Sequence, residues 1–377
     1  MFSNVTRDGI PDRSELNDVR TTLTFGALVA LLLSAAPRAQ TSSAFFVELP
    51  ENALPYSVDG SGWVSVGLSY QRTDGMYWMP TTGMVELGGV TALEVSRDGR
   101  RIVGNAFDAK ARLNAAVWQG GSVWQPLGGL SPNAQPCDAT LSSTFGANAD
   151  ATVVVGLGWD GCRFARAFRW TAQTGMVSLG SLTGASTRAN GVSADGRVIV
   201  GWEQPEGPRY GAKWVDGIEQ MIKAQSGGPV GEAFAANRDG SIIVGSNCDF
   251  KKQPVIVPTG FVWAAQNGVQ CLPVPLPSWL APLPYQVIVQ GTSDDGRVMV
   301  GSYTFGLDAE ALIWLDGQMY FLRDYLRNNG VPTAFARWVN SGFATAVTPD
   351  GRTIVGYGAG PNTFQGYMVI LPDRGKP

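Results

Sequence analysis

The most regular feature of the chain is a short apolar run, bounded by turn residues and glycine, that recurs along most of its length. In each copy an Asp-Gly dipeptide, or a variant of it, precedes a run of β-branched residues that ends in Val-Gly. Asp-Gly between apolar runs favours a tight hairpin turn, because glycine adopts positive φ without steric cost. The seven copies are Asp59-Gly60 to Gly67, Asp98-Gly99 to Gly104, Asp150-Ala151 to Gly156, Asp195-Gly196 to Gly201, Asp239-Gly240 to Gly245, Asp295-Gly296 to Gly301 and Asp350-Gly351 to Gly356. We interpret the aspartates as turn formers rather than catalytic acids, and the first hairpin as two residues longer than the others.

A second landmark follows each hairpin: a small residue, two others, and then tryptophan. The copies are Gly75–Trp78, Ala115–Trp118, Ala167–Trp170, Gly211–Trp214, Gly260–Trp263, Ala311–Trp314 and Gly366–Val369, where valine replaces tryptophan. A small residue and a large aromatic at fixed spacing indicate interlocking layers, so we expect these tryptophans in the core. A further turn and strand follow each tryptophan. One repeat therefore predicts four strands.

The length of the repeat and its two ends predict the fold. Successive Val-Gly glycines lie 37 to 56 residues apart, which is typical of propeller blades. The seventh repeat stops at Val369–Pro372 without a fourth strand, whereas Phe45–Leu49, ahead of the first hairpin, resembles the fourth strand at Met84–Leu87. We predict an all-β, seven-bladed β-propeller of four-stranded blades, closed by the N-terminal strand, which completes the last blade. Closure removes exposed sheet edges; an open solenoid, the alternative, gives no reason to split a repeat.

The N-terminus carries a second kind of apolar pattern. Leu23–Ala36 is a run of 14 apolar and small residues, short for a membrane span and typical of a signal-peptide core; the alternative is a buried helix. We predict a signal peptide over 1–39 and a single propeller domain over 40–377, and hence a secreted or periplasmic protein with no membrane span after cleavage. Acidic residues outnumber basic ones over 1–18, which suggests that the start is misassigned and that translation begins near Val19.

Four cysteines in an exported chain predict disulfides. Three pairings are possible. In the repeat scheme Cys137 and Cys162 lie at the same end of repeat three, and Cys248 and Cys271 at the same end of repeat five, so we expect these two pairs. No cysteine spacing matches a zinc motif, and we expect neither a metal nor a cofactor.

Composition excludes several kinds of chemistry. The 377 residues include no histidine, so Ser-His-Asp and Cys-His catalysis and histidine-ligated zinc are excluded. The net charge is −3, and no block of lysine and arginine stands out, so we expect no nucleic-acid partner.

In the predicted blades, the Asp-Gly turns and the turns after tryptophan share one face of the ring. The opposite face, here called the long-loop face, carries the longer segments 128–143, 246–259, 273–286 and 323–343. Binding residues concentrate on such loops. The candidate binding residues on this face are the aromatics Trp159, Trp202, Trp279, Tyr285 and Tyr303. Each can stack on a sugar or pack on a partner, and each can equally well cover a loop core.

The repeat also resembles a known family. ANGVSADGRVIVGW at 189–202, RAFRWT at 166–171 and GMVSLGSL at 175–182, with the C-terminal stretches LRDYLRNNG at 322–330, AVTPDGRTIVGYG at 346–358 and GYMVILP at 366–372, resemble the HAF-type extracellular repeat of bacterial proteins. The resemblance covers nearly all of residues 44–372. The family's His-Ala-Phe triplet reads Arg166-Ala167-Phe168 here. The resemblance implies an extracellular, propeller-like protein and carries over no catalytic residue.

These observations favour a secreted, non-enzymatic binding or scaffold propeller, monomeric, that recognises an unidentified protein or glycan through the long-loop face. The alternative is a carbohydrate-active hydrolase or lyase that uses aspartate and glutamate without histidine. The acids outside the turns that could serve it are Glu203, Glu206, Asp249, Asp308 and Glu310. A calcium site at Asp294-Asp295-Gly296 is a third, weaker hypothesis. Two carboxylates that converge in a pocket on the long-loop face would favour the enzyme, and a broad polar or aromatic surface would favour binding.

Overall fold

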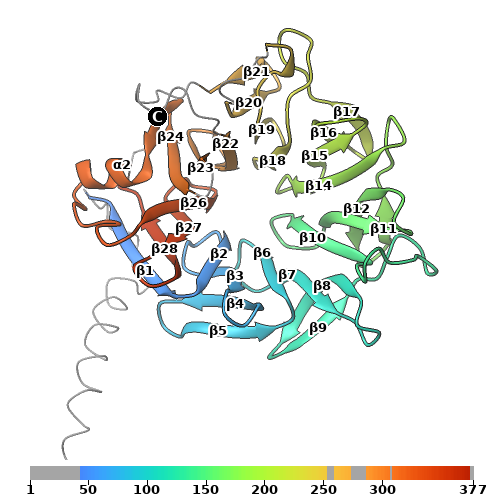
Figure 1. Cartoon of the computed structure of the whole chain (residues 1–377), viewed down its shortest axis with the longest axis horizontal. Helices are drawn as coiled ribbons and strands as arrows, with labels where there is room; N and C mark the ends of the chain where they lie inside the picture. Colours follow the sequence, from blue (N-terminus) through green and yellow to red (C-terminus); the bar gives the residue numbers. More distant parts are fainter. Residues whose placement is uncertain (1–42, 253–258, 273–285, 306–307, 374–377) are drawn as a thin grey trace, which may run out of the picture.

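The computed structural model describes residues 43–373, apart from 253–258, 273–285 and 306–307. Seven four-stranded antiparallel sheets are arranged as the blades of a ring (Figure 1), which confirms the predicted seven-bladed propeller. The predicted signal peptide over 1–39 lies outside the described residues. Within the described ranges no helix is long and apolar enough to cross a membrane.

The blades are numbered here in chain order, with the strands of each given from the inside of the ring outward. Blade one comprises β2 (Ala53–Val58), β3 (Ser65–Ser69), β4 (Asp74–Met79) and β5 (Gly83–Gly88); blade two β6 (Thr91–Val95), β7 (Ile102–Phe107), β8 (Leu113–Gly120) and β9 (Val123–Pro126); blade three β10 (Ser142–Ala147), β11 (Val154–Trp159), β12 (Ala165–Thr171) and β13 (Gly175–Ser178); blade four β14 (Ser186–Val192), β15 (Val198–Gln204), β16 (Tyr210–Val215) and β17 (Ile218–Met221). Blade five comprises β18 (Ala233–Ala236), β19 (Ile242–Gly245), β20 (Phe261–Ala264) and β21 (Gly268–Cys271); blade six β22 (Gln286–Thr292), β23 (Val298–Phe305), β24 (Asp308–Leu315) and β25 (Gln318–Phe321); blade seven β26 (Asn340–Val347), β27 (Thr353–Ala359), β28 (Phe364–Ile370) and β1 (Phe45–Glu51). Helix α2 (Leu322–Asn328) and the 3₁₀ turn η1 (Phe250–Lys252) lie between strands.

The turn between the first two strands is built in the same way in all seven blades. In blade four Ser193 Oγ accepts a hydrogen bond from the N–H of Val198, at 3.0 Å, and the equivalent capping residues are Asp59, Ser96, Asn148, Asn237, Ser293 and Thr348. The turn aspartate accepts a second bond from the N–H two residues on, as Asp195 does from Arg197 at 3.1 Å. The aspartates at this turn position in blades two to seven are therefore turn formers, as predicted.

The sequence-based interpretation of the first hairpin is wrong. Asp59 occupies the capping position, since its carbonyl accepts the N–H of Gly62 at 3.0 Å and its Oδ1 accepts the N–H of Val64 at 2.9 Å. The turn glycine is Gly62, with φ of 77°. This hairpin therefore has the same length as the others, because Asp59-Gly60 imitates the turn dipeptide two residues too early.

The Val-Gly glycine is required by a β-bulge in the inner strand. Each inner strand shifts its register against the second strand, which bends the strand locally. The bulge brings a carbonyl oxygen against the glycine, so that a Cβ on Gly201 would lie 1.9 Å from the carbonyl oxygen of Arg188. The corresponding distances in the other six blades are 1.9 to 2.2 Å. No other residue fits this position without moving the inner strand.

The tryptophan landmark is only partly a core feature. Trp78, Trp214 and Trp314 are buried, as expected. Their counterparts in blades two, three and five, Trp118, Trp170 and Trp263, are half-buried. The apolar clusters lie between neighbouring blades, so the side chains of adjacent sheets interlock around the ring.

The N-terminal strand closes the ring as predicted. Strand β1 pairs antiparallel with β28, with Phe45 opposite Ile370 and Glu48 opposite Tyr367. The Phe46 ring centroid lies 4.6 Å from that of Phe335, and Leu49 is 1% exposed. The first and last segments of the described chain therefore share one blade.

Candidate functional site

The inner strands of the seven blades face the middle of the ring (Figure 1). They surround a central cavity of about 450 Å³. One layer of its wall consists of the residue six positions before the turn glycine in each blade. The layer contains Tyr56, Leu93, Phe145, Asn190, Phe234, Gln290 and Thr345. Aromatic, aliphatic, amide and hydroxyl side chains thus occupy equivalent positions. The backbone of the wall repeats, whereas its surface chemistry changes from blade to blade.

The cavity narrows at the end where the Asp-Gly turns lie. Arg97 and Asp294, which directly precede turns in blades two and six, form an ion pair of 2.7 Å between Nη2 and Oδ1. Backbone hydrogen bonds also join neighbouring blades at this end of the cavity. The N–H of Arg97 donates to the carbonyl of Ala149 at 2.7 Å, and the N–H of Asp294 donates to that of Pro349 at 2.8 Å. The Arg97–Asp294 pair and these backbone hydrogen bonds therefore join the blades at the Asp-Gly end of the cavity.

The two carboxylates of the calcium site suggested by the sequence, Asp294 and Asp295, have partners within the protein. Asp294 is paired with Arg97, and Asp295 accepts hydrogen bonds from Ser293 Oγ at 2.6 Å and from the N–H of Arg297 at 3.0 Å. Both side chains thus act within the turn and the channel wall.

One carboxyl group lies in the channel wall at a position that is otherwise small. Five positions before the turn glycine, most blades carry glycine or alanine: Gly146, Gly191, Ala235, Gly291 and Ala346. The exceptions are Ser57 and Glu94, in neighbouring blades one and two, where Ser57 Oγ donates a hydrogen bond to Glu94 Oε1. Burial raises the pKa of Glu94 to about 7, against the opposing effect of the Ser57 hydrogen bond. The channel thus contains a carboxyl group that titrates near neutral pH.

The blade-four side of the channel is basic. Arg188 pairs with Glu232 at 2.9 Å and donates from Nε to Asn190 Oδ1 at 2.7 Å. Its guanidinium lies 4.3 Å from the centroid of the Phe145 ring, which is a cation–π arrangement. Burial lowers the pKa of Arg188, and the charge of Glu232 counteracts this effect. These contacts fix the guanidinium at the channel wall.

The aromatics predicted from the sequence do not gather at this cavity. Trp202 is 4% exposed and lies between two guanidinium groups, those of Arg188 at 5.2 Å and Arg209 at 4.6 Å. Tyr303 is 5% exposed, and Trp159 is half-buried at the end of β11. None of these three lines the cavity. Trp279 and Tyr285 lie outside the described residues.

Sequence reasoning missed the aromatics that do line the channel, namely Tyr56, Phe145 and Phe234. They stand in inner strands whose apolar pattern resembles that of the core. The signal that could have found them is the variation at one repeat position, because neighbouring positions of the repeat are nearly constant.

The acids proposed for an enzyme do not line the cavity either. Glu203 is fully buried in blade four, where its Oε1 accepts hydrogen bonds from Ser181 Oγ and from the N–H and Oγ1 of Thr183, the latter two at 2.9 Å. Burial, together with the charge of Glu203, raises the pKa of Glu219 to about 7. The described cavity is lined by two carboxyl groups, Glu94 and the ion-paired Asp294.

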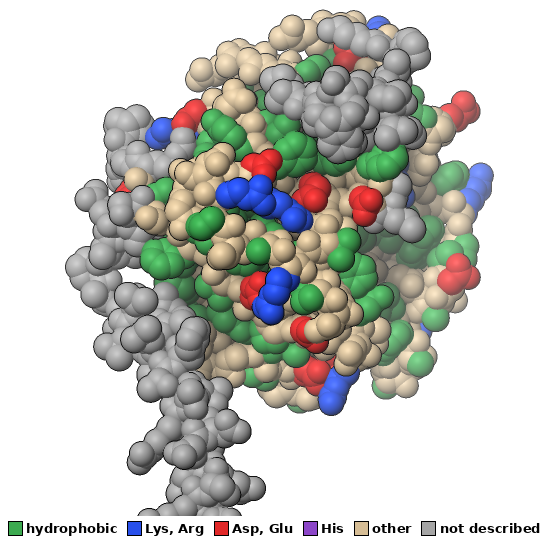
Figure 2. Space-filling view, turned by 60° about the vertical axis from the view of Figure 1, so that its left-hand side comes forward, with side chains coloured by type: hydrophobic (Ala, Val, Ile, Leu, Met, Phe, Trp, Pro, Cys, Tyr) green, Lys and Arg blue, Asp and Glu red, His purple; other side chains and the backbone are tan. Residues whose placement is uncertain are grey.

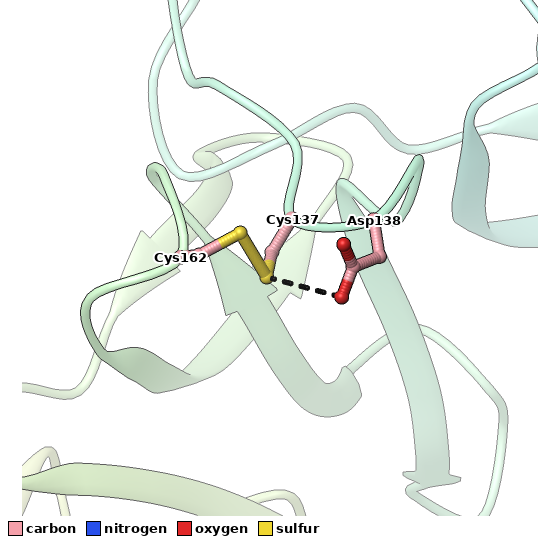
Figure 3. A group of neighbouring side chains, drawn as sticks. All are labelled: Cys137, Asp138 and Cys162. Carbon is pink, nitrogen blue, oxygen red and sulfur yellow. Dashed lines mark hydrogen bonds between the residues drawn. A yellow bond between two sulfur atoms is a disulfide. The ribbon is translucent and has the colours of Figure 1, made fainter.

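The two predicted disulfides are present. Cys137–Cys162 and Cys248–Cys271 have Cα–Cα distances of 4.7 and 5.3 Å. Asp138 Oδ2 lies 3.9 Å from Cys137 Sγ, so that Cys137, Asp138 and Cys162 form a group with metal-ligand atoms (Figure 3). Metal binding by cysteine requires thiolates, and both sulfur atoms of this group are committed to the disulfide. The group therefore serves to join the loops around blade three.

Charges of both signs are interspersed on the face shown in Figure 2, among apolar and uncharged groups. Elsewhere on the described surface, neighbouring charges form ion pairs, for example Arg297 with Asp316 at 2.7 Å. On this face no continuous basic area is visible.

The closed ring of four-stranded blades defines the chain as a seven-bladed β-propeller. No family model and no curated protein matches its sequence. Solved structures share the fold: an oligogalacturonate lyase from Vibrio parahaemolyticus is 13% identical, with 89% of this chain and 98% of that chain covered at a TM-score of 0.53. An oligogalacturonate lyase in complex with manganese is 12% identical, with 88% and 97% covered at a TM-score of 0.52. At these identities the likeness shows the fold alone.

Proposed function

We propose that this protein is an exported, non-enzymatic binding propeller that recognises a protein or a glycan through the channel mouth on its long-loop face. The observation that carries the proposal is the layer of seven wall residues, which differ between blades, whereas the turns and bulges that hold them are the same in every blade. A specific binding site is expected to combine a constant backbone with wall side chains that change from blade to blade.

The distribution of carboxyl groups supports binding over the hydrolase form of the enzymatic alternative. Hydrolysis of a glycoside requires two carboxyl groups about 5–10 Å apart, both available to the substrate. Of the two carboxyl groups in the described cavity wall, Asp294 is held by Arg97 at 2.7 Å. This leaves Glu94 without a second carboxyl group for a hydrolytic pair in the described cavity.

Export is part of the proposal. Two disulfides are typical of proteins in oxidising compartments, and they support a signal peptide over 1–39 and a secreted or periplasmic location. The resemblance to the HAF-type extracellular repeat points in the same direction. We expect the mature protein to act as a monomer, and Trp159 to contribute to the long-loop surface.

The test is a binding screen of the mature chain against a glycan array and a peptide library. Phe145→Ala and Phe234→Ala remove channel aromatics, and we expect each to weaken binding of a hit about tenfold or more, since stacking contacts contribute roughly 1–3 kcal/mol each. Arg197→Ala is the matched control, because Arg197 lies on the Asp-Gly face and its side chain is 67% exposed. Trp159→Ala tests the surface beyond the channel.

Two outcomes would overturn the proposal. Hits that the channel variants bind as tightly as the wild type would place recognition elsewhere. Turnover of a bound glycan, seen as new reducing ends or unsaturated products, would establish the carbohydrate-active enzyme instead.

A further inference from the structure

Glu94 is the one position where the repeat places a carboxyl group in a wall built for small residues. A Cβ at the equivalent Gly191 would lie 2.7 Å from the carbonyl oxygen of Phe234, and one at Gly146 would lie 3.0 Å from that of Asn190, so the blades approach closely at this level. A carboxylate buried here is unfavourable unless a partner neutralises it. A destabilising group at one position of seven indicates a functional role for that position.

The charged groups around Glu94 leave it without a cation. Arg97, three residues later on the same chain, pairs with Asp294, and Arg188 across the channel pairs with Glu232. Among the described residues no ion pair involves Glu94, and its hydrogen-bond partners are the neutral hydroxyl of Ser57 and the N–H of Val95. The carboxyl group therefore lacks the positive charge that its ionised form requires.

A second acceptor lies unsatisfied in the same wall. Gln290 Oε1 is buried and has no hydrogen-bond partner among the described residues, and Gln290 lines the cavity together with Glu94. The other amide of this layer, Asn190, is already occupied, since it accepts from Arg188 and donates to the carbonyl of Ala233 at 2.9 Å. The wall thus contains a carboxyl group without a cation in blade two and, separately, a buried amide oxygen without a donor in blade six.

We propose that the channel binds a primary ammonium group at Glu94, carried into the cavity by the partner. An ammonium group provides hydrogen-bond donors and the positive charge that an ionised Glu94 lacks. The rings of Tyr56 and Phe234 line the same cavity, and aromatic faces attract cations. This inference rests on the proposed binding function and specifies the group that is recognised, whether a lysine side chain or an amino sugar carries it.

Binding of an ammonium group is linked to pH. Glu94 must be ionised to bind it, and the pKa of the free group is about 7. Of the other groups facing the channel, Tyr56 stays neutral because burial raises its pKa, and Arg97, Arg188, Asp294 and Glu232 are held in ion pairs. The affinity for a lysine ammonium, which stays protonated over this range, should therefore rise about tenfold from pH 6 to pH 8 as the ionised fraction of Glu94 increases, and binding at pH 6 to 7 should release protons.

The experiment is calorimetric titration of the mature chain with Nα-acetyl-lysine methylamide, with glucosamine, and with N-acetylglucosamine, in which the amine is blocked. We expect one of the two amines to bind and the blocked sugar not to. Glu94→Gln keeps the size of the side chain and should weaken amine binding at least about tenfold at pH 8 and abolish the pH dependence. Glu206→Gln, at an exposed residue of blade four, is the matched control and should bind as the wild type does.

The two amines distinguish the sources: preference for the lysine derivative indicates a protein partner, and preference for glucosamine a glycan. The inference is overturned if neither amine binds, if Glu94→Gln binds as tightly as the wild type, or if the blocked sugar binds equally well. The pH profile and proton release of the wild type test it without any variant. A screen hit that depends on Phe145 but not on Glu94 would overturn this inference and leave the binding function standing.

Discussion

The repeat uses glycine for two reasons, a positive φ and a close contact with the neighbouring blade. Two glycines with similar backbone conformations distinguish these reasons. Gly240 has φ of 73° and Gly217 has φ of 83°. A Cβ on Gly240 would lie 2.4 Å from Cβ of Val198 in the preceding blade, whereas one on Gly217 would have nothing within 4 Å. We expect Gly217→Ala to reduce the free energy of unfolding by about 1 kcal/mol, from backbone strain alone. Gly240→Ala should reduce it by roughly 1–3 kcal/mol more, because the neighbouring blade must move. Urea denaturation measures both.

Val198→Ala provides the control. Combined with Gly240→Ala it should restore part of the lost stability, because it removes Cγ1 and Cγ2 of Val198, which would lie 2.8 and 2.4 Å from the new Cβ, and leaves only the contact with Cβ. The coupling appears in a double-mutant cycle. Equal costs for the two glycine substitutions would contradict the argument. Blade three offers a natural parallel: Ala151 stands at the turn-glycine position with φ of 52°, and the place of Val198 in the preceding blade is taken by Arg101, an exposed residue.

At the same scale, the sequence reveals turns and bulges because they depend on neighbouring residues. Asp239-Gly240 identifies its hairpin without any knowledge of the ring. The interpretation failed at Asp59, because this capping residue and the glycine after it imitate the turn dipeptide. A capping hydrogen bond joins residues five positions apart, so two adjacent residues do not reveal it. Glu94 was missed because in Thr91–Val95 it looks like the polar position of an alternating strand, although closure of the ring places it inside the channel.

At the scale of elements, an acidic pair, the buried Glu203 and the half-buried Glu219, connects blade four to the segment that precedes it. Glu203 on β15 accepts hydrogen bonds from Ser181 and Thr183, which lie between β13 and β14. Glu219 on β17 has its pKa raised to about 7 by burial and by the charge of Glu203, against the opposing effects of hydrogen bonds from the Leu182 N–H and the Trp214 side chain. The packing of this connection therefore depends on protonation.

This arrangement predicts how stability changes with pH. Since the folded-state pKa of Glu219 lies above the ordinary value of 4.5, the folded state retains the proton longer than the unfolded state. The proton on Glu219 therefore stabilises the folded state fully below pH 4.5, and this stabilisation is lost as the pH rises through 7. In Glu219→Gln we expect the decline in the free energy of unfolding between pH 5 and pH 8 to be smaller by roughly 1–2 kcal/mol, a value reduced for partial exposure.

Denaturation curves at pH 5, 6, 7 and 8 measure this difference. Glu206→Gln, which changes an exposed glutamate of the same blade, should decline as steeply as the wild type. A Glu219→Gln variant with an unchanged slope would show that the pair does not titrate in this range.

The strands and the disulfides were predicted correctly because the repeat sets their order. The roles of the residues that these strands carry were not predicted. The positions of Cys137 and Cys162 relative to two strands were enough to pair them, because the four-strand blade sets which loops share an end. Trp202 follows a Val-Gly strand end, a place that the sequence assigns to the surface. Arg188 and Arg209 cover it, and a contact between separate strands has no local sequence signal.

At the scale of the whole molecule, the ring depends on nine N-terminal residues of the described chain. Segment 43–51 provides β1, whose Phe46 contacts Phe335 and whose Glu48 accepts a hydrogen bond from Trp338 Nε1 at 3.0 Å. These contacts bind the last blade to a segment that enters the ring before the first. The channel keeps its shape only if this blade is complete, since β26 forms part of the cavity wall.

Removal of β1 should therefore open the ring. A chain that begins at Glu51 exposes the edge of β28 together with buried Tyr367 and Met368, and exposed edges promote aggregation. We expect a large drop in melting temperature and aggregation in size-exclusion chromatography relative to the predicted mature chain from Gln40, which keeps β1 and should elute as a single species. A synthetic peptide of residues 43–51 should restore stability in a concentration-dependent manner, because it binds the folded state alone. If the chain from Glu51 melts at the temperature of the chain from Gln40, β1 does not close the ring, and the channel must be held open by the other blades.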